Sequence, residues 1–316
     1  GHQSVYFALG QNRDNDALFK EAMSTLQDAP KESLAPVSVH DFRPILHEMR
    51  LFKSACEVAV MKAAGEISSR AHKRAMQYAS PGCFEYQLEA EIHHEFAMAG
   101  ARSPAYSTIV GSGENACILH YTQNAAEIKD GDLILIDAGA EYQGYAADIT
   151  RTFPANGKFS QPQRDIYSVV LKAQQSVLAM LGPGVTLSEA MLHSAEVITE
   201  GLVNLGILQG SLAENLEQET WRDYYMHGLG HYLGLDVHDV GNYKIEGEDR
   251  RLKPSMVITV EPGIYISEDS DVPDQYKGIG VRIEDDVVIT ATGIEILTAD
   301  VPKEIEEIEA LMASSR

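Results

Sequence analysis

The 316-residue sequence predicts an α+β protein built from two related halves. In each half, two stretches with helical periodicity are followed by short apolar stretches typical of strands. The stretches GDLILIDAGAEY (131–142) and PSMVITVEPGIY (254–265) also match. In each of them, an apolar run is followed by a carboxylate, then a small or imino residue, then a glycine. This self-similarity favours a duplicated fold with a pseudo-twofold axis and one site at the seam. Chance is the alternative explanation, because the Pro-Gly pairs that end helical stretches in both halves, at 81–82 and 183–184, are a common stop signal.

The helices of both halves are bounded by glycine and proline stop signals. In the first half, the periodicity indicates two consecutive helices from Ile45 onward with a break near Ser54, and then a helix over Glu85–Ala99. In the second half, it indicates helices over Gln163–Leu181 and Leu187–Leu205. Both halves therefore have the same order of elements.

The first 44 residues predict elements too small to form a domain. VYFALG (Val5–Gly10) indicates a short buried strand, and Asp14–Gln27 indicates an amphipathic helix followed by an irregular stretch. We therefore expect residues 1–44 to be the C-terminal remnant of a truncated N-terminal domain with a linker. Residues 45–316 are expected to form the domain that carries the site.

Composition and charge argue against several classes of partner. Hydrophobic residues make up 44% of the chain, and the net charge of −22 without a cluster of Lys and Arg argues against binding nucleic acid or an anionic membrane. No apolar run reaches membrane-spanning length. Cys56, Cys83 and Cys117 show neither CxxC spacing nor a paired framework, so we expect buried reduced thiols and a cytoplasmic location.

Five residues of metal-ligand type lie at the ends of apolar, strand-like stretches: Asp137, Asp148, His231, Glu261 and Glu284. A carboxylate buried without a partner costs several kcal/mol or changes its protonation state, so these charges need compensation. Four oxygen ligands with one imidazole suit Mn²⁺ and also admit Co²⁺, Fe²⁺ or Zn²⁺. Because one divalent ion would leave excess negative charge, we expect two ions that share bridging carboxylates. For any single residue, an ordinary turn-forming acid is the alternative.

The spacing of these acids indicates how they meet. Asp137 and Asp148 are eleven residues apart with a Gly-containing turn between them. Two adjacent antiparallel strands would point both carboxylates at one spot. Two further strand-like stretches, MVITVEPGIYI and GIGVRIEDDVVIT, bring Glu261 and Glu284.

The segment YYMHGLGHYLGLDVHDVG holds His227, His231 and His238 among glycines. The spacing of the first two resembles the helical zinc motif, but Gly228 and Gly230 disfavour a helix and the glutamate of that motif is absent. We therefore expect an extended or looping segment. GLGHYLG lacks the context of a dinucleotide-binding loop, and GSGENA at 111–116 is expected to be an ordinary turn.

The remaining histidines give weaker signals. His120, in LHYTQN, follows an apolar run and precedes a polar loop, although a lone histidine in such a place is more often structural. His93 and His94 are expected on a solvated helix face. His72 is expected to be a surface or helix residue without a function.

Taken together, these motifs resemble the peptidase family with the pita-bread fold. The motifs that carry the resemblance are LHYTQN, LIDAGAEYQGYAADITRTFP, MHGLGHYLGLDVHDVG, TVEPGIYI and GIGVRIEDD, and they span nearly all of residues 45–316. The match is close to the bacterial aminopeptidase P branch, whereas creatinase lacks the ligand set and methionine aminopeptidases are shorter. Prolidase is harder to separate.

The resemblance implies a role for each site residue. Asp148 and Glu284 would bridge two metals, Asp137 would bind one of them, and His231 and Glu261 would bind the other. Glu261 would also transfer the proton, and His238 would stabilise the oxyanion. The residues expected to line the substrate region are His120, His227 and His238, and the residues expected to support the metal ligands are Arg282, as a partner of Asp137, and Tyr265.

The resemblance also implies an activity. A hydroxide bridging two divalent metals, with Mn²⁺ favoured, would remove the N-terminal residue from peptides that have proline in the second position. The alternatives are a prolidase, which cleaves Xaa-Pro dipeptides, and a non-catalytic peptide-binding member of the same fold. The family further implies a possible homo-oligomer, either a dimer or a tetramer.

Overall fold

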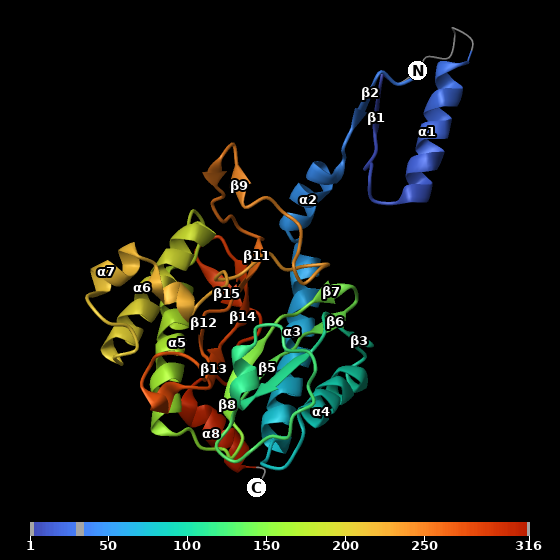
Figure 1. The fold of residues 1–316 in the computed structure, drawn as a ribbon. Coiled ribbons are helices and arrows are strands. Elements are labelled where there is room, and N and C mark those ends of the chain that lie inside the picture. Colours follow the sequence, from blue (N-terminus) through green and yellow to red (C-terminus); the bar gives the residue numbers. More distant parts are fainter. Residues whose placement is uncertain (1–2, 30–34, 315–316) are drawn as a thin grey trace. The chain divides into compact units, whose positions relative to one another are not determined.

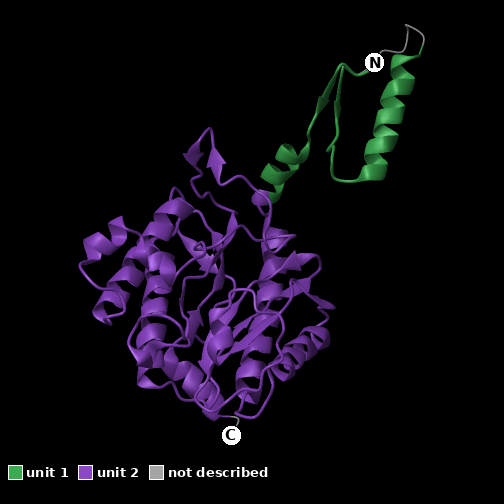
Figure 2. Cartoon of the chain, in the orientation of Figure 1, with its two compact units in different colours: residues 1–50 green, residues 51–316 purple. Residues whose placement is uncertain are grey.

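A computed structural model describes residues 3–29 and 35–314. The chain divides into two compact units, Gly1–Arg50 and Leu51–Arg316 (Figure 2). Helix α2 (Arg43–Leu51) spans this division, and the boundary expected from the sequence, between residues 44 and 45, falls within the same helix. The origin of residues 1–44 as a remnant of a larger domain stays a prediction.

The smaller unit contains α1 (Arg13–Gln27) and a pair of short strands. Asn12 caps α1, because its side chain accepts hydrogen bonds from two backbone N–H groups of the first turn. Strand β1 (Ser4–Tyr6) pairs in parallel with β2 (Ser38–His40). The expectation of a buried strand over Val5–Gly10 was wrong, because the strand is shorter and its side chains are exposed or half-buried. Two short strands and one helix offer too little apolar surface to cover them.

The first half of the larger unit runs from two helices into strands. Helices α3 (Ala55–Tyr78) and α4 (Glu85–Met98) pack against each other. The predicted break near Ser54 is confirmed, because Ser54 forms a capping box with Glu57 at the start of α3. The strands of this half are β3 (Ser103–Pro104), β4 (Ile109–Ser112), β5 (Leu133–Asp137), β6 (Ala140–Tyr142), β7 (Tyr145–Ala146) and β8 (Thr150–Pro154). GSGENA forms the end of β4 and the 3-10 helix η1 (Gly113–Cys117) rather than a simple turn.

The second half begins with α5 (Gln161–Met180) and α6 (Leu187–Asn204), which confirm the predicted helices to within two residues at each end. The remaining elements are α7 (Leu212–Glu217), η2 (Thr220–Asp223), β9 (Lys244–Ile245), β10 (Glu248–Asp249), β11 (Val257–Val260), β12 (Gly263–Ile266), η3 (Asp274–Tyr276), β13 (Ile279–Arg282), β14 (Asp285–Ile289), β15 (Ile294–Ile296) and α8 (Ile305–Ala313). Strands β8 and β11–β15 lie between α5 on one side and α3 on the other (Figure 1).

The two halves repeat one arrangement of strands. β5 pairs antiparallel with β8, and β11 pairs antiparallel with β14. Between the paired strands the chain forms a further antiparallel pair, β6 with β7 in the first half and β12 with β13 in the second. This shared pattern is what a duplicated α+β fold predicts.

Buried contacts join the halves where β8 meets the start of β14. The backbone N–H of Glu284 donates to the carbonyl of Thr150 at 3.1 Å. Next to this bond, Nη2 of Arg151 lies 2.7 Å from Asp285 Oδ1, and both side chains are fully buried. Lys303 contacts the other oxygen of Asp285 at 2.7 Å. A shielded ion-pair network therefore fixes β8 against β14 beside the expected metal ligands.

The three cysteines are free, as expected. They are not all buried, however: Cys56 is exposed in the first turn of α3, and Cys83 and Cys117 are half-buried. The prediction of buried thiols was therefore wrong: none of the three side chains is fully buried, and the first turn of α3 turns Cys56 toward solvent.

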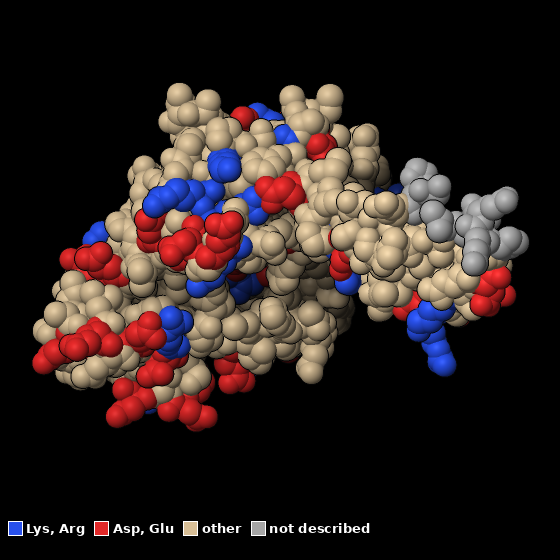
Figure 3. Space-filling view, turned by 90° about the horizontal axis from the view of Figure 1, so that it is seen from above, with Lys and Arg blue, Asp and Glu red and all other residues tan. Residues whose placement is uncertain are grey.

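The surface carries both signs of charge. On the face drawn in Figure 3, basic side chains lie among acidic ones, although the whole chain has a net charge of −22. Among the residues that the structure describes, no helix combines the length and the apolar character needed to cross a bilayer.

Candidate metal centre

Four carboxylates meet at the ends of the two strand pairs. Asp137 is the last residue of β5, and Asp148 comes two residues before β8. Glu261 directly follows β11, and Glu284 directly precedes β14. Antiparallel pairing places the two members of each pair at the same end of their sheet. Because the two halves are hydrogen-bonded beside Glu284, all four carboxylates face one space.

A cavity of 80 Å³ occupies this space. Every site residue predicted from the sequence lines it except Tyr265, which instead contacts the lining residue Arg282. The residues that line the cavity are Leu119, His120, Asp137, Asp148, His227, His231, His238, Glu261, Arg282 and Glu284. The fold thus brings together side chains that are far apart in the sequence.

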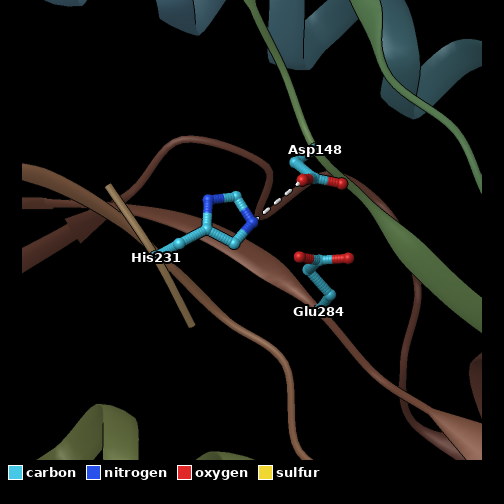
Figure 4. Close-up of side chains that lie close together, drawn as sticks. All are labelled: Asp148, His231 and Glu284. Carbon is cyan, nitrogen blue, oxygen red and sulfur yellow. Dashed lines mark ion pairs between the residues drawn. The ribbon is translucent and has the colours of Figure 1, made fainter. Parts of the chain in front are cut away.

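The tightest group of possible ligands is Asp148, His231 and Glu284, which point toward one another (Figure 4). One ligand atom from each lies within 4.8 Å of the others. Nε2 of His231 is 3.4 Å from Asp148 Oδ2 and 3.6 Å from Glu261 Oε1. Nδ1 of His231 lies 3.0 Å from the carbonyl oxygen of Tyr232. A proton on Nδ1 satisfies that carbonyl and leaves the lone pair of Nε2 free for a cation.

Arg282 is the buried cationic partner that holds Asp137 in place. Its Nη2 lies 2.6 Å from Asp137 Oδ2, which is the ion pair expected from the sequence. Its Nε donates to Thr150 Oγ1 at 3.0 Å, and its Nη1 donates to the Tyr265 hydroxyl at 2.9 Å. The Tyr265 hydroxyl in turn lies 2.8 Å from Nε2 of His227. Arg282 is only 4% exposed, so these bonds are shielded from water and fix the orientation of Asp137.

Tyr106 belongs to the site, although the sequence analysis missed it. Its hydroxyl lies 2.6 Å from Asp137 Oδ1 and also 2.6 Å from Asp148 Oδ1. One hydroxyl proton serves only one of these carboxylates at a time, so the other needs a proton or a cation. Tyr106 lies in the irregular stretch before β4, where no periodicity or motif distinguishes it from other loop residues.

Two further buried groups support the carboxylates from behind. The backbone N–H of Asp148 donates to Oδ2 of Asp286 at 3.0 Å, and Asp286 is 1% exposed. Nε2 of His72 lies 2.9 Å from the carbonyl of Ala138, the residue after Asp137. The expectation of a surface or helix position for His72 was half correct, because it lies on α3 but is fully buried. It thereby fixes the backbone beside a predicted ligand.

The pKa values of the site show that it holds more negative charge than it can keep ionised. Burial raises the pKa of Asp137, and burial together with the charge of Asp148 raises the pKa of Glu284 well above its usual value. Burial also raises the pKa of Glu261 to about 7. Burial alone would lower the pKa of His231, but the hydrogen bond and charge of Asp148 raise it to about 9. A bound cation would remove the need for these protons.

Three imidazoles form the rim of the site. His120, His227 and His238 line an outer groove of 360 Å³, and this groove shares these three residues, His231 and Glu261 with the metal cavity. Burial lowers the pKa of His227 to about 3 and also lowers the pKa of His238. Both rings are therefore neutral near pH 7 and can donate or accept a hydrogen bond.

The histidine-rich segment is extended or looping, as predicted, because residues 227–241 contain no helix. Leu229–Leu233 runs antiparallel along β11, with a bridge between Tyr232 and Ile258. A Cβ on Gly230 would lie only 2.0 Å from the carbonyl oxygen of Thr259. Glycine is therefore required for the segment to approach β11 and deliver His231 to the cavity.

A cavity lined by carboxylates and imidazoles, at the seam of a duplicated α+β fold, defines a metal-dependent hydrolase. The chain belongs to metallopeptidase family M24, whose sequence pattern matches residues 59–291.

Two relatives and one solved structure are similar to this chain over most of its length. The chain is 55% identical to the Xaa-Pro aminopeptidase of Escherichia coli (strain K12) over all of its own length and 72% of that protein. It is 58% identical to the Xaa-Pro aminopeptidase of Haemophilus influenzae over 86% of its own length and 63% of that protein. The structure of zinc-substituted E. coli aminopeptidase P in complex with product matches with a TM-score of 0.98 and 55% identity, over 100% of this chain and 72% of that one.

Proposed function

We propose that this chain is an Xaa-Pro aminopeptidase, which removes the N-terminal residue from peptides that have proline in the second position. The observation that carries the proposal is the convergence of four carboxylates and His231 on one cavity, in a chain 55% identical to a protein of that name. The alternative of a creatinase-like fold without metal is disfavoured because all five predicted ligand positions keep a metal-ligand side chain.

We assign the five predicted ligands to two divalent ions. In this assignment Asp148 and Glu284 would bridge them, Asp137 would bind one ion, and His231 and Glu261 would bind the other. The chemistry of the site fits such a pair, because four carboxylates beside one guanidinium leave excess negative charge in a buried space. Oxygen ligands with one imidazole favour Mn²⁺ and also accept Co²⁺, Fe²⁺ or Zn²⁺.

Glu261 and His238 can carry out the steps of peptide hydrolysis that the metal ions do not supply. When bound, two such ions supply an acidified water near neutral pH and polarise the scissile carbonyl. Glu261 lies between the metal cavity and the outer groove, where it can take a proton from the attacking water and return it to the leaving nitrogen. His238 lies on the rim with its ring 4.3 Å from that of His231, where it can donate to the developing oxyanion.

The rim also fits the proposed specificity. The free amino terminus of the substrate is placed against Asp137, which limits cleavage to the first peptide bond. An Xaa-Pro bond has no amide hydrogen, so the groove needs no acceptor at that position. His120, His227 and His238 line the groove where the proline ring would pack.

Two peptides separate the proposal from its nearest rival. Incubation of the Mn²⁺-loaded chain with Arg-Pro-Pro should release arginine, whereas Gly-Pro should be a poor substrate. Cleavage of Gly-Pro alone would establish a prolidase instead. Binding of Xaa-Pro peptides without turnover under the same conditions would establish the non-catalytic alternative.

Three further expectations remain proposals. A cytoplasmic location follows from the unpaired cysteines, and peptides rather than nucleic acids or membranes are the expected partners. A homo-oligomer, either a dimer or a tetramer, is proposed for the whole protein. Light scattering coupled to size exclusion tests the last of these directly.

A further inference from the structure

The segment Leu229–Leu233 has one edge bonded to the sheet and one edge facing away from it. The carbonyls of Leu229 and His231 accept bonds from β11, and the N–H of Leu233 donates to β11. In an extended strand, the groups of alternate residues point to opposite edges. The N–H and carbonyl of Tyr232 bond to groups outside β11, and those of Gly230 form no hydrogen bond with β11.

At this outer edge, only Tyr232 has its backbone groups satisfied. Its N–H donates to the hydroxyl of Tyr243, and its carbonyl accepts from the N–H of Asp239. The N–H and carbonyl of Gly230 form no hydrogen bond with any residue that the structure describes. Gly228, two residues earlier, is exposed, and the nearest atom to a Cβ there would be the backbone nitrogen of Gly230 at 4.0 Å. This leaves an open stretch of strand edge directly beside His231.

A second groove adjoins that edge. It has a volume of 410 Å³, and α6 contributes its apolar side chains, Leu187, Met191 and Leu192. The groove shares Gly228, Gly230 and Tyr243 with the outer groove of the metal centre. Leu192 is 64% exposed and lines the groove together with Leu187 and Met191, and a contiguous exposed apolar surface of this kind is typical of a binding site.

We propose that Gly230 and the apolar groove on α6 together bind the part of the peptide substrate downstream of the proline, in an extended conformation. The backbone of the peptide adds to the free edge at Gly230, and one apolar side chain enters the groove beside Leu192. Addition of a peptide strand to an exposed edge is a common mode of recognition, with affinity from the main chain and specificity from side-chain pockets. The continuity of the two grooves identifies the occupant as a peptide that already lies at the metal centre.

This inference rests on the proposed function and adds a substrate class to it. A dipeptide ends before it can reach the second groove, whereas a peptide of four or more residues extends along the edge at about 3.3 Å per residue. Peptides with an apolar residue at the third or fourth position are therefore the preferred substrates.

Three tetrapeptides and two variants test the groove. With the full, Mn²⁺-loaded chain, Ala-Pro-Leu-Gly or Ala-Pro-Gly-Leu should have a kcat/KM roughly tenfold above that of Ala-Pro-Gly-Gly, the size of discrimination that one apolar contact provides. In Leu192→Glu this preference should disappear. Met98→Glu adds the same charge at an exposed apolar position on α4, outside both grooves, and should retain the preference. An unchanged leucine preference in Leu192→Glu, or no preference in the wild type, would overturn the groove assignment.

Methylation of single peptide nitrogens tests the backbone pairing of the peptide with Gly230. N-methylation removes one backbone donor without changing the side chains, so one downstream position should lose roughly fivefold or more in kcat/KM, the value of one hydrogen bond. Equal losses at all downstream positions would contradict pairing with Gly230.

If the wild type cleaves none of the peptides, the proposed function fails, and calorimetric binding of the same peptides to wild type and Leu192→Glu tests the groove separately. Equal affinities of the two proteins would then overturn it.

Discussion

Replacing Arg282 measures how far a buried partner of Asp137 contributes to metal binding. The guanidinium makes three bonds, to Asp137 at 2.6 Å, to Tyr265 at 2.9 Å and to Thr150 at 3.0 Å. Arg282→Ala leaves Asp137 without its cation in a buried space, and breaking a buried ion pair typically costs about 3–5 kcal/mol of unfolding free energy. Losing a group that orients a metal ligand typically weakens metal binding about 10–100-fold.

Charge and orientation predict opposite effects here, and a second variant separates them. Loss of one positive charge alone would strengthen the attraction for a cation, whereas loss of orientation weakens binding. Because Arg282 fixes three groups at once, we expect orientation to dominate and Arg282→Ala to bind Mn²⁺ at least about tenfold more weakly. Arg282→Lys keeps the charge, but a lysine cannot form the hydrogen bonds to Asp137, Tyr265 and Thr150 in the same geometry. This variant should therefore also bind Mn²⁺ more weakly.

Calorimetric Mn²⁺ titration and urea unfolding of the metal-free proteins provide the two readouts for both variants. Mn²⁺ affinity and hydrolysis of Arg-Pro-Pro equal to wild type in Arg282→Ala would refute the reasoning. Tighter Mn²⁺ binding in Arg282→Ala, with wild-type binding in Arg282→Lys, would show that charge rather than orientation governs the site.

Three further predictions follow from the same geometry. Tyr106→Phe removes the hydroxyl that contacts both aspartates, so kcat/KM for Arg-Pro-Pro should fall about tenfold while the melting temperature stays near that of wild type, and a wild-type rate would contradict this role. In the metal-free protein the pKa of His231 is about 9 and that of Glu261 about 7, so Mn²⁺ binding must displace protons. Affinity should therefore rise with pH up to about 9, and pH-independent calorimetric affinity would contradict it. The pKa of Asp285 is lowered, although burial opposes this, because Arg151 and its neighbours favour the charged form. Asp285→Asn should cost about 3–5 kcal/mol in urea unfolding at pH 7. The loss should shrink as pH falls below about 4, where the wild-type contribution also disappears, and an equal loss at low pH would argue against the ion pair.

The sequence predicted the parts of the site that local patterns determine. Asp137 and Glu284 are recognisable because a charged residue at the end of an apolar strand is costly without a partner. The capping box at Ser54 and the helix of α5 are equally local signals. Strand pairing then followed from the eleven-residue spacing of Asp137 and Asp148.

The residues that the sequence did not reveal act through tertiary contacts. Tyr106 comes from a loop, His72 from a helix and Asp286 from a strand, and each reaches the carboxylates only after the chain has folded. No periodicity marks such positions, because their partners lie tens of residues away. The exposure of Cys56 was missed for a related reason, since burial depends on which face of α3 meets the sheet.

Anomalous diffraction from crystals of the Mn²⁺-loaded chain tests the central claim most directly. Two peaks per chain are predicted in the cavity, both bound by Asp148 and Glu284, one also by Asp137 and the other by His231 and Glu261. A single peak, or peaks outside this cavity, would contradict the two-metal site.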